Sequence, residues 1–168
     1  RPGAAPRGGW LCLGPSPRPP AAHRGLAAVT RRVHTPSRTA ARDPSPLGAI
    51  PVVTPAGAAE GVDGLLLCVS DNAAVEAVLF GANGASNQLA AGSVVVDCST
   101  IAPATAIASA QRLARQDVHY LDAPVTGGTE GAKAGSLTVL VGGKTASLER
   151  ARPVLEIIGG SIHHFGPV

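Results

Sequence analysis

Aromatic residues are nearly absent from this sequence: they make up 2% of its 168 residues, with one Trp, one Tyr and two Phe. A hydrophobic core must therefore be built from Val, Leu, Ile and Ala, and the aromatic platforms that stack the bases of single-stranded nucleic acid are not expected. The three cysteines stand in no Cys-x-x-Cys or His-paired spacing, which argues against a disulfide framework and against a zinc site. No stretch reaches the roughly 18 consecutive apolar residues of a membrane span, so an integral membrane protein is not expected either.

Methionine is missing altogether. A chain that begins at Arg1 without an initiator Met is expected to be a processed product or a fragment of a longer reading frame.

Basic residues are concentrated at one end of the chain. Residues 1–50 hold eight Arg and a single acid, a net charge of +7, whereas the remaining 118 residues hold six bases and ten acids, a net charge of −4. The overall charge of +3 is therefore a property of the N-terminal segment. No basic surface for nucleic acid is expected where the chain folds.

The segment 1–46 carries nine of the fifteen prolines and shows no sustained apolar periodicity. Such a segment cannot bury enough apolar surface to offset its ordering entropy, so we expect it to be disordered and outside the packed domain. An organelle transit peptide, a solvated linker and an out-of-frame translation of a GC-rich gene all fit this composition. A basic arm for nucleic acid ranks last, because proline interrupts every arginine cluster.

From about residue 47 onward, short apolar runs alternate with longer stretches of helical periodicity. The run 64–69 is apolar without alternation, which is typical of a parallel strand buried on both faces, and Asp71 is placed to cap a helix after it. The same pattern recurs to the end of the chain and predicts an α/β fold with helices on the faces of a sheet. The predicted strands are 64–69, 93–97, 118–121, 136–141 and 161–165, and the predicted helices are 72–80, 103–115 and 147–158, with Pro153 a point where the last helix is expected to bend or divide.

Three of the predicted strands end in polar residues, and ligands of open α/β sheets bind beyond the carboxyl ends of the strands. The first end carries Ser70 and Asp71, and the second carries Ser99 and Thr100 before a helix. Hydroxyl residues in that position most often cap the helix, whereas the functional alternative is that their hydroxyls and amides face a ligand. The third end is the loop 124–128, Pro-Val-Thr-Gly-Gly, which forms either an ordinary tight turn or a set of bare backbone amides open to an anion.

Taken together, the strand ends are far more specific than any one of them. The stretches VVVDCSTIAPATA and YLDAPVTGGTEGAKAGSLTVLVGG resemble the β-hydroxyacid dehydrogenase family, which includes 3-hydroxyisobutyrate dehydrogenase, tartronate semialdehyde reductase and 6-phosphogluconate dehydrogenase. The resemblance also takes in GLLLCVSDNAAVEAVLFG and IIGGSIHHFGPV, so it covers residues 47–168. It implies a Rossmann-like NAD(P)-binding domain with a mostly parallel sheet, followed in the family by a long helical domain that supports dimers.

The resemblance also implies roles for particular residues in binding the cofactor. Val69 and Ser70 are expected to line its adenosine-ribose and pyrophosphate side, and Thr100 its nicotinamide end. Arg38 stands where the family places an Arg for the 2′-phosphate, which favours NADP as the cofactor, with NAD as the alternative.

The substrate carboxylate is expected to lie against Thr126, Gly127 and Gly128. The family usually has Ser where Thr126 stands, and Thr keeps the hydroxyl group.

The sequence departs from the family's pattern at both ends. No first strand with a Gly-x-Gly-x-x-Gly turn is recognisable, since Gly9 and Gly14 lie in a proline-broken stretch. The chain stops at Val168, before the helix on which the family carries its catalytic Lys, and Lys133 and Lys144 do not lie at the matching position. We therefore expect residues 47–168 to be a partial NAD(P)-binding domain, without the helical domain, a catalytic residue or turnover of its own.

The resulting interpretation is the cofactor domain of an NAD(P)-dependent oxidoreductase. The parent enzyme would oxidise a small 3-hydroxy acid or reduce a semialdehyde or a glyoxylate-like acid, and would be homo-oligomeric, with no nucleic-acid or membrane partner. The alternative is a non-catalytic, truncated module that pairs with a full-length homologue. The expected compartment is the cytoplasm, or a mitochondrion or plastid if the N-terminal segment is a transit peptide.

Overall fold

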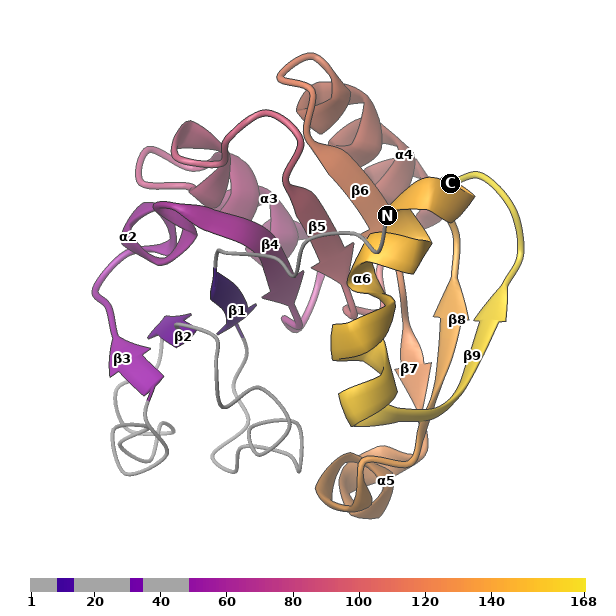
Figure 1. Ribbon diagram of the computed structural model, residues 1–168. Helices are drawn as coiled ribbons and strands as arrows, with labels where there is room; N and C mark the ends of the chain where they lie inside the picture. The colour runs from indigo at the N-terminus through magenta and orange to yellow at the C-terminus, as the bar shows by residue number, and fades with distance from the viewer. Residues whose placement is uncertain (1–8, 14–30, 35–48) are drawn as a thin grey trace, which may run out of the picture.

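A six-stranded parallel sheet forms the centre of the molecule in the computed structural model, which describes residues 9–13, 31–34 and 49–168 (Figure 1). The strands are β1 Gly9–Leu13, β2 Arg31–His34, β3 Ala49–Pro51, β4 Val62–Leu67, β5 Val94–Asp97 and β6 His119–Asp122. Their order is β3-β2-β1-β4-β5-β6, so the first strand of the chain lies in the middle of the sheet. Each strand runs parallel to its neighbours.

The two faces of this sheet pack against different helices. In β4, Leu65 and Leu67 are fully buried in a core that includes side chains of three helices, α2 Pro55–Ala59, α3 Asn72–Phe80 and α4 Pro103–Ala114. Leu66 belongs to a second core, built with α6 Thr145–Ile158. Because side chains alternate along a strand, this division confirms the prediction that an unbroken apolar run is buried on both sides. Within the described ranges, no helix is both long and apolar enough to cross a bilayer.

Helix α3 begins and ends where its flanking residues require it. The Asp71 carboxylate accepts the backbone N–H of Ala74 at 2.8 Å, which caps the first turn. The helix stops at Gly81, where a Cβ atom would lie 2.5 Å from the carbonyl oxygen of Ala77. The predicted range 72–80 is confirmed.

A second sheet of three strands follows β6. It consists of β7 Val125–Thr126, β8 Leu137–Val141 and β9 Gly159–His164, with β7 antiparallel and β9 parallel to the central β8. Helix α5, Gly128–Ala134, connects β7 to β8, and α6 connects β8 to β9 without a division at Pro153. A backbone bridge between Asp122 and Gly142 joins this sheet to the end of β6.

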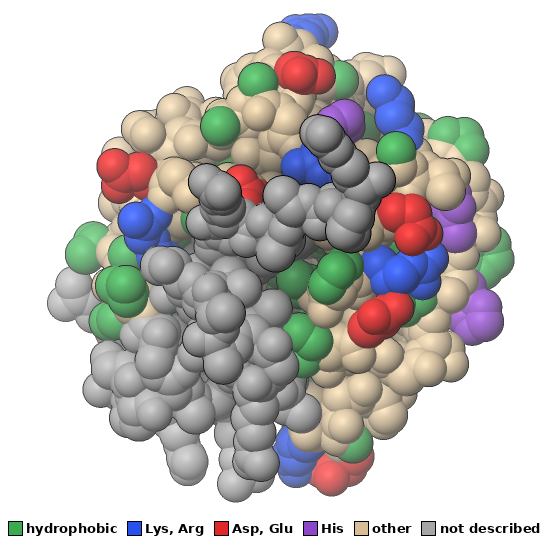
Figure 2. Space-filling model, in the orientation of Figure 1, with side chains coloured by type: hydrophobic (Ala, Val, Ile, Leu, Met, Phe, Trp, Pro, Cys, Tyr) green, Lys and Arg blue, Asp and Glu red, His purple; other side chains and the backbone are tan. Residues whose placement is uncertain are grey.

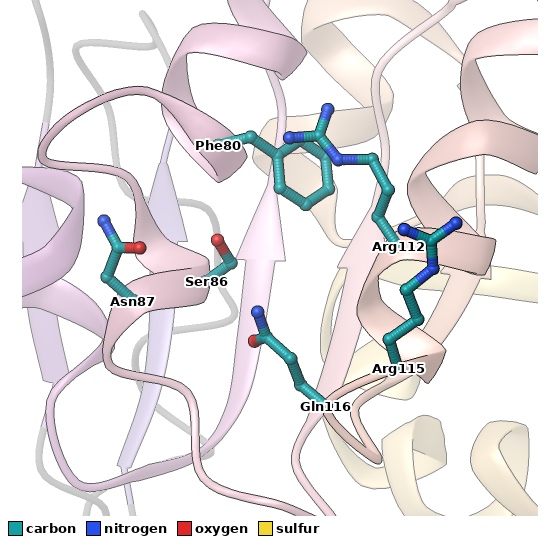
Figure 3. A pocket seen from close by; sticks show the side chains of 6 residues that line it. All are labelled: Phe80, Ser86, Asn87, Arg112, Arg115 and Gln116. Carbon is teal, nitrogen blue, oxygen red and sulfur yellow. The ribbon is translucent and has the colours of Figure 1, made fainter.

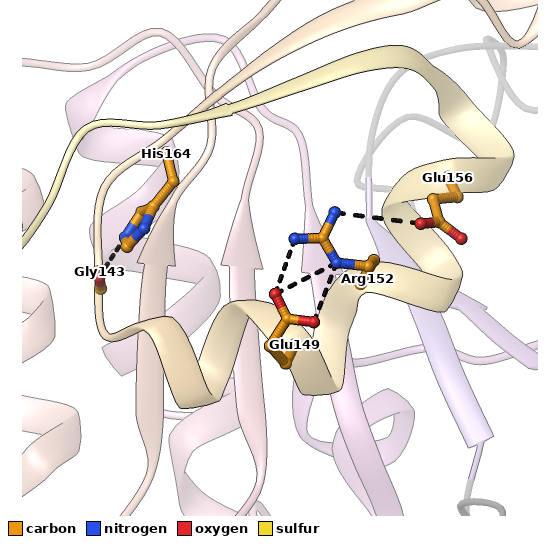
Figure 4. A network of polar contacts seen from close by, with 5 residues as sticks. All are labelled: Gly143, Glu149, Arg152, Glu156 and His164. Carbon is orange, nitrogen blue, oxygen red and sulfur yellow. Dashed lines mark hydrogen bonds and ion pairs between the residues drawn. The ribbon is translucent and has the colours of Figure 1, made fainter.

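Polar contacts hold the surface of α6 and the end of β9 (Figure 4). Arg152 pairs with Glu149 at 2.7 Å and with Glu156 at 4.0 Å, and the His164 ring Nε2 donates to the Gly143 carbonyl oxygen at 2.7 Å. Figure 2 shows acidic and basic side chains interspersed on the described part of the face it presents, with no gathering of one sign.

The N-terminal segment differs in part from the expectation that residues 1–46 lie outside the packed domain. Two stretches of it are strands of the sheet, and β1 pairs with β4 from Gly9↔Val62 to Leu13↔Leu67. The apolar run of β1 is only four residues long and lies among glycines and prolines, so it carries no periodicity that a sequence pattern could detect. The expectation that no first strand precedes Gly14 is therefore corrected, and the rest of the segment lies outside the described residues.

Candidate functional site

The carboxyl ends of β4, β5 and β6 lie at one edge of the sheet, because the three strands are neighbours and parallel. The chain leaves β1 toward β2 on one side, while β4 lies on the other side, so the order of strands reverses between β1 and β4. In sheets of this kind the crevice beside that reversal point is where ligands bind. The segments that border this edge are 68–70, 98–100 and 123–128.

A buried carboxylate ties these strand ends together. Asp97, at the end of β5, has no exposed surface, and its oxygens accept the Ser99 N–H and the Tyr120 hydroxyl, each at 2.9 Å. The Ser99 Oγ in turn accepts the backbone N–H of Val69 at 2.9 Å. The carbonyl oxygen of Asp97 accepts the N–H of Ala123 at 2.7 Å. Residues after β4, β5 and β6 are thus joined through the side chains of Asp97 and Ser99 and the Asp97 backbone.

Burial governs the electrostatics of this edge. Desolvation raises the pKa of Asp97, and hydrogen bonds donated by Ser99 and Tyr120 oppose that rise. Burial and the nearby Asp97 carboxylate together raise the pKa of Tyr120, which keeps its hydroxyl protonated as a donor. Burial and the same carboxylate also raise the pKa of Asp122 and of the Cys68 thiol. Burial at this edge therefore makes the charged forms of Asp97, Asp122 and Cys68 less favourable than they are in water.

Three of the four residues predicted to bind the cofactor, Val69, Ser70 and Thr100, lie in the segments that border this edge. Val69 is half-buried and its N–H is held by Ser99, whereas Ser70 is exposed and donates to the Asp71 carboxylate at 2.9 Å. Thr100 is exposed one residue beyond Ser99. Arg38 lies outside the described residues.

The expectation that Ser99 or Thr100 caps the next helix is wrong. The N-cap residue of helix α4 is Ala102, whose side chain makes no capping hydrogen bond. The N–H of Ala102 is accepted by the Asn72 side chain at 2.9 Å instead. Ser99 is turned inward, because the buried Asp97 carboxylate accepts its N–H.

The loop predicted to hold a carboxylate joins β7 to α5. Thr126 is exposed and pairs with Thr138 of β8. Gly127 and Gly128 follow, with φ of 127° and 60°, both in the region that favours glycine. The chain therefore leaves β7 on bare, exposed backbone before α5 begins, an arrangement open to an anion as well as to a simple turn.

Sequence reasoning did not assign Asp97 and Tyr120 any role. The sequence feature that could have pointed to them is an acid at the end of the apolar run of β5, followed by a Tyr in the apolar run of the next strand, β6. A charge at the end of a buried strand needs donors, and only the pairing of β5 with β6 shows that Tyr120 supplies one.

The described residues form two hollows beside the sheet, one at its amino edge and one next to the carboxyl end of β6. A polar one of about 280 Å³ lies where α3 and α4 end, close to the amino ends of β5 and β6, and Arg112 stacks 3.6 Å from the Phe80 ring centroid there (Figure 3). Its lining is Phe80, Ser86, Asn87, Arg112, Arg115 and Gln116. The other is an apolar groove of about 270 Å³ beside the end of β6, whose lining includes Asp122, Ile107, Leu140 and Phe165.

A parallel sheet in the order 3-2-1-4-5-6, with a hydrogen-bonded carboxyl edge beside its reversal point, defines a dinucleotide-binding domain. The sequence model of one family, the NAD binding domain of 6-phosphogluconate dehydrogenase, matches residues 23–166. The chain belongs to this family, within the β-hydroxyacid dehydrogenases, and the resemblance found in the sequence is confirmed.

Three comparisons illustrate the relationship. The 2-hydroxy-3-oxopropionate reductase of Escherichia coli is 40% identical over 116 residues, which are 69% of this chain and 40% of the reductase. The 3-hydroxyisobutyrate dehydrogenase of Mycobacterium tuberculosis, solved with L-serine, superposes with a TM-score of 0.85 at 26% identity, over 96% of this chain and 55% of that one. Psf3 in complex with NADP+ and 2-OPP gives a TM-score of 0.84 at 30% identity, over 94% of this chain and 56% of Psf3. The chain thus spans about half the length of the relatives it matches.

Proposed function

We propose that this chain binds NADP(H) at the carboxyl edge of its six-stranded sheet and serves as the cofactor domain of a dehydrogenase or reductase of small hydroxy acids. The observation that supports this most directly is the joining of the β4, β5 and β6 ends into one edge through Asp97 and Ser99. The small-acid class of substrate is carried over from the relatives, which include a 2-hydroxy-3-oxopropionate reductase and a 3-hydroxyisobutyrate dehydrogenase.

The residues fit a dinucleotide better at one end than at the other. Ser70 and Thr100 are exposed at the carboxyl edge and can meet the ribose and nicotinamide portions. After β1 the sequence continues Gly14-Pro15-Ser16-Pro17, and proline has no N–H to offer a pyrophosphate. We therefore expect weak cofactor binding. The sequence resemblance matches Arg38 to the family's Arg for the 2′-phosphate, which favours NADP over NAD.

Hydride transfer would come from the nicotinamide when it is bound. The role of this chain in the reaction would be to hold the substrate. The Thr126 hydroxyl and the exposed backbone amides of Gly127 and Gly128 would face the substrate carboxylate. The proton for the substrate oxygen needs another group, since Lys133 pairs with Glu130 on α5 and Lys144 stands at the start of α6. The chain by itself is therefore expected to bind without turnover.

Titration with NADPH and NADH, followed by nicotinamide fluorescence, tests the cofactor part of the proposal. We expect weak binding, a preference for NADPH that Arg38→Ala removes, and no oxidation of 3-hydroxy acids. Micromolar affinity would mean that the segment after β1 supplies a phosphate site. Measurable turnover would mean that a residue of this chain supplies the proton for the substrate oxygen, and would contradict the assignment.

A chimera tests the substrate loop. The parts of the E. coli reductase outside the 116 matched residues would be joined to this chain, and reduction of a small semialdehyde acid measured. Thr126→Ala removes a charge-assisted hydrogen bond worth about 1.5–3 kcal/mol, which corresponds to about a tenfold to a hundredfold loss in kcat/KM. Thr126→Ser keeps the hydroxyl and is the matched control, with a nearly unchanged rate. An active chimera indifferent to Thr126→Ala would leave the loop as a structural turn.

A second candidate function, a non-catalytic module that pairs with a full-length homologue, is favoured by the apolar groove beside β6. Phe165, Ile107 and Leu140 at this groove are 73%, 42% and 38% exposed, which is unusual for large apolar side chains. Light scattering of the chain alone and mixed with the E. coli reductase would detect such a pair. A mixture that stays as two separate species would exclude pairing with this homologue.

A further inference from the structure

Hydrogen bonds join Val69, a residue expected at the cofactor, to two residues that lie too deep to touch the cofactor. Asp97 and Ser99 are 0% and 1% exposed, whereas Ser70 and Thr100, next to Val69 and Ser99 in the sequence, are exposed. A buried polar side chain of this kind contributes through the groups that it holds in place.

A series of hydrogen bonds runs from the buried Asp97 carboxylate through Ser99 to the backbone of Val69. The Asp97 carboxylate accepts the Ser99 N–H at 2.9 Å and the Tyr120 hydroxyl at 2.9 Å. With its N–H held there, Ser99 presents its Oγ to the Val69 N–H at 2.9 Å. Val69 lies after the end of β4, so its N–H depends on Ser99 and not on the β-ladder.

From this geometry we infer that Asp97 and Ser99 are positioning residues for the cofactor, which fix the backbone of residues 69–70 and 99–100 before NADP(H) arrives. The inference rests on the proposed binding of NADP(H). It adds that affinity is set partly by two side chains that never contact the dinucleotide. Pre-ordering of a loop lowers the entropy lost on binding, so release of the Val69 N–H weakens binding without the loss of any direct contact.

Ser93 provides a matched control at the other end of β5. It precedes β5 at the opposite, amino edge, is 3% exposed, and donates its hydroxyl to the Val62 carbonyl oxygen at 3.3 Å. Ser93→Ala and Ser99→Ala therefore delete the same buried hydroxyl group from the two ends of one strand. A general loss of stability should be similar in both, and only Ser99→Ala should affect residues 69–70.

The experiment combines two measurements on the full chain. Hydrogen exchange without cofactor, resolved at single amides by NMR, is expected to show at least about tenfold faster exchange of the Val69 amide in Ser99→Ala than in Ser93→Ala. NADPH titration is expected to give about a twofold to tenfold higher Kd in Ser99→Ala, the loss equivalent to one net hydrogen bond, and an unchanged Kd in Ser93→Ala. Asp97→Asn keeps an oxygen for the Ser99 N–H and should lie between Asp97→Ala and the wild type in both measurements.

The two possible failures are distinguishable. If the wild type does not bind NADPH, the proposed function is wrong, while the exchange of the Val69 amide still decides whether Ser99 orders this loop. If the wild type binds but Ser99→Ala and Ser93→Ala change the Kd equally, or if Val69 exchange is the same in both, the positioning role is overturned.

Discussion

At the scale of single residues, Asp97 is a buried acid in a core built mainly from aliphatic side chains. Its donors are a serine and a tyrosine, both neutral, so its charge is stabilised by hydrogen bonds alone in the contacts that the described residues make with it. An acid whose pKa is raised by folding binds its proton more tightly in the folded protein than in the unfolded chain.

The pH dependence of stability follows from that difference. Between the ordinary pKa of an Asp and the raised pKa of Asp97, the folded protein holds more protons than the unfolded chain, so its free energy of unfolding falls as the pH rises through this window. Asp97→Asn should remove this part of the dependence. Urea unfolding from about pH 4 to pH 8 should therefore show a flatter profile for the variant. Asp97 also contributes to the raised pKa of Asp122, so Asp97→Asn should lower the Asp122 pKa and flatten the profile further. Parallel unfolding profiles of the variant and the wild type would contradict the assignment.

Gly127 and Gly128 form a second residue-scale test, because they differ in what a side chain would meet. A Cβ at Gly127 would lie 3.2 Å from the Leu137 Cδ2 at a φ of 127°, whereas one at Gly128 would meet nothing within 4 Å at a φ of 60°. Gly127→Ala should destabilise the fold by about 2–3 kcal/mol and Gly128→Ala by about 1–2 kcal/mol, measured by urea unfolding. Equal losses would mean that the loop rearranges around Leu137.

At the scale of elements, the sequence predicts best where a strand or helix carries its own boundary signals. Helix α3 has Asp71 before it and Gly81 after it, and it was predicted to the residue. Strand β5 was predicted to within one residue, whereas β4 begins and ends two residues earlier than predicted, because Asp63 and Gly64 interrupt its apolar pattern. Helix α5 was missed, because Gly128, Gly131 and Gly135 in and beside it are poor helix formers and its fold depends on β8 beside it. The capping role expected for Ser99 failed because a buried acid competes for the same residue, which only strand pairing reveals.

The contact between α3 and α4 provides an element-scale prediction. Arg112 of α4 stacks on Phe80 of α3 and pairs with Glu76 of α3 at 2.5 Å (Figure 3). Arg112→Ala should lower the free energy of unfolding by about 1 kcal/mol, since a partly exposed cation–π contact and an exposed ion pair each contribute a fraction of that. Arg115→Ala, in the same hollow, is the control and should change it by less than about 0.5 kcal/mol. Similar losses for both would show that the stack adds nothing beyond surface charge.

At the scale of the whole molecule, the folded domain includes parts of the N-terminal segment, because β1 and β2 belong to the six-stranded sheet. Because β1 lies between β2 and β4, removal of it would leave a gap in the middle of the sheet. Limited proteolysis should therefore spare residues 9–13 and 31–34 under native conditions, and cleavage after Arg18 or Arg24 should leave the fragments associated. Early loss of the whole segment 1–46, with a core that remains folded from about residue 47, would instead support the original expectation from composition.

The central place of β1 also has a consequence for how the protein is made. Trp10 pairs with Gly64, so the strand at the middle of the sheet is synthesised long before the neighbour that completes it. Until residues 62–67 leave the ribosome, one edge of β1 has no partner, and contacts this distant in sequence form slowly. Unpaired strand edges are sites of association between chains. Synthesis at lower temperature or with chaperones should therefore raise the yield of folded protein more than it would for a chain whose neighbouring strands follow one another in sequence.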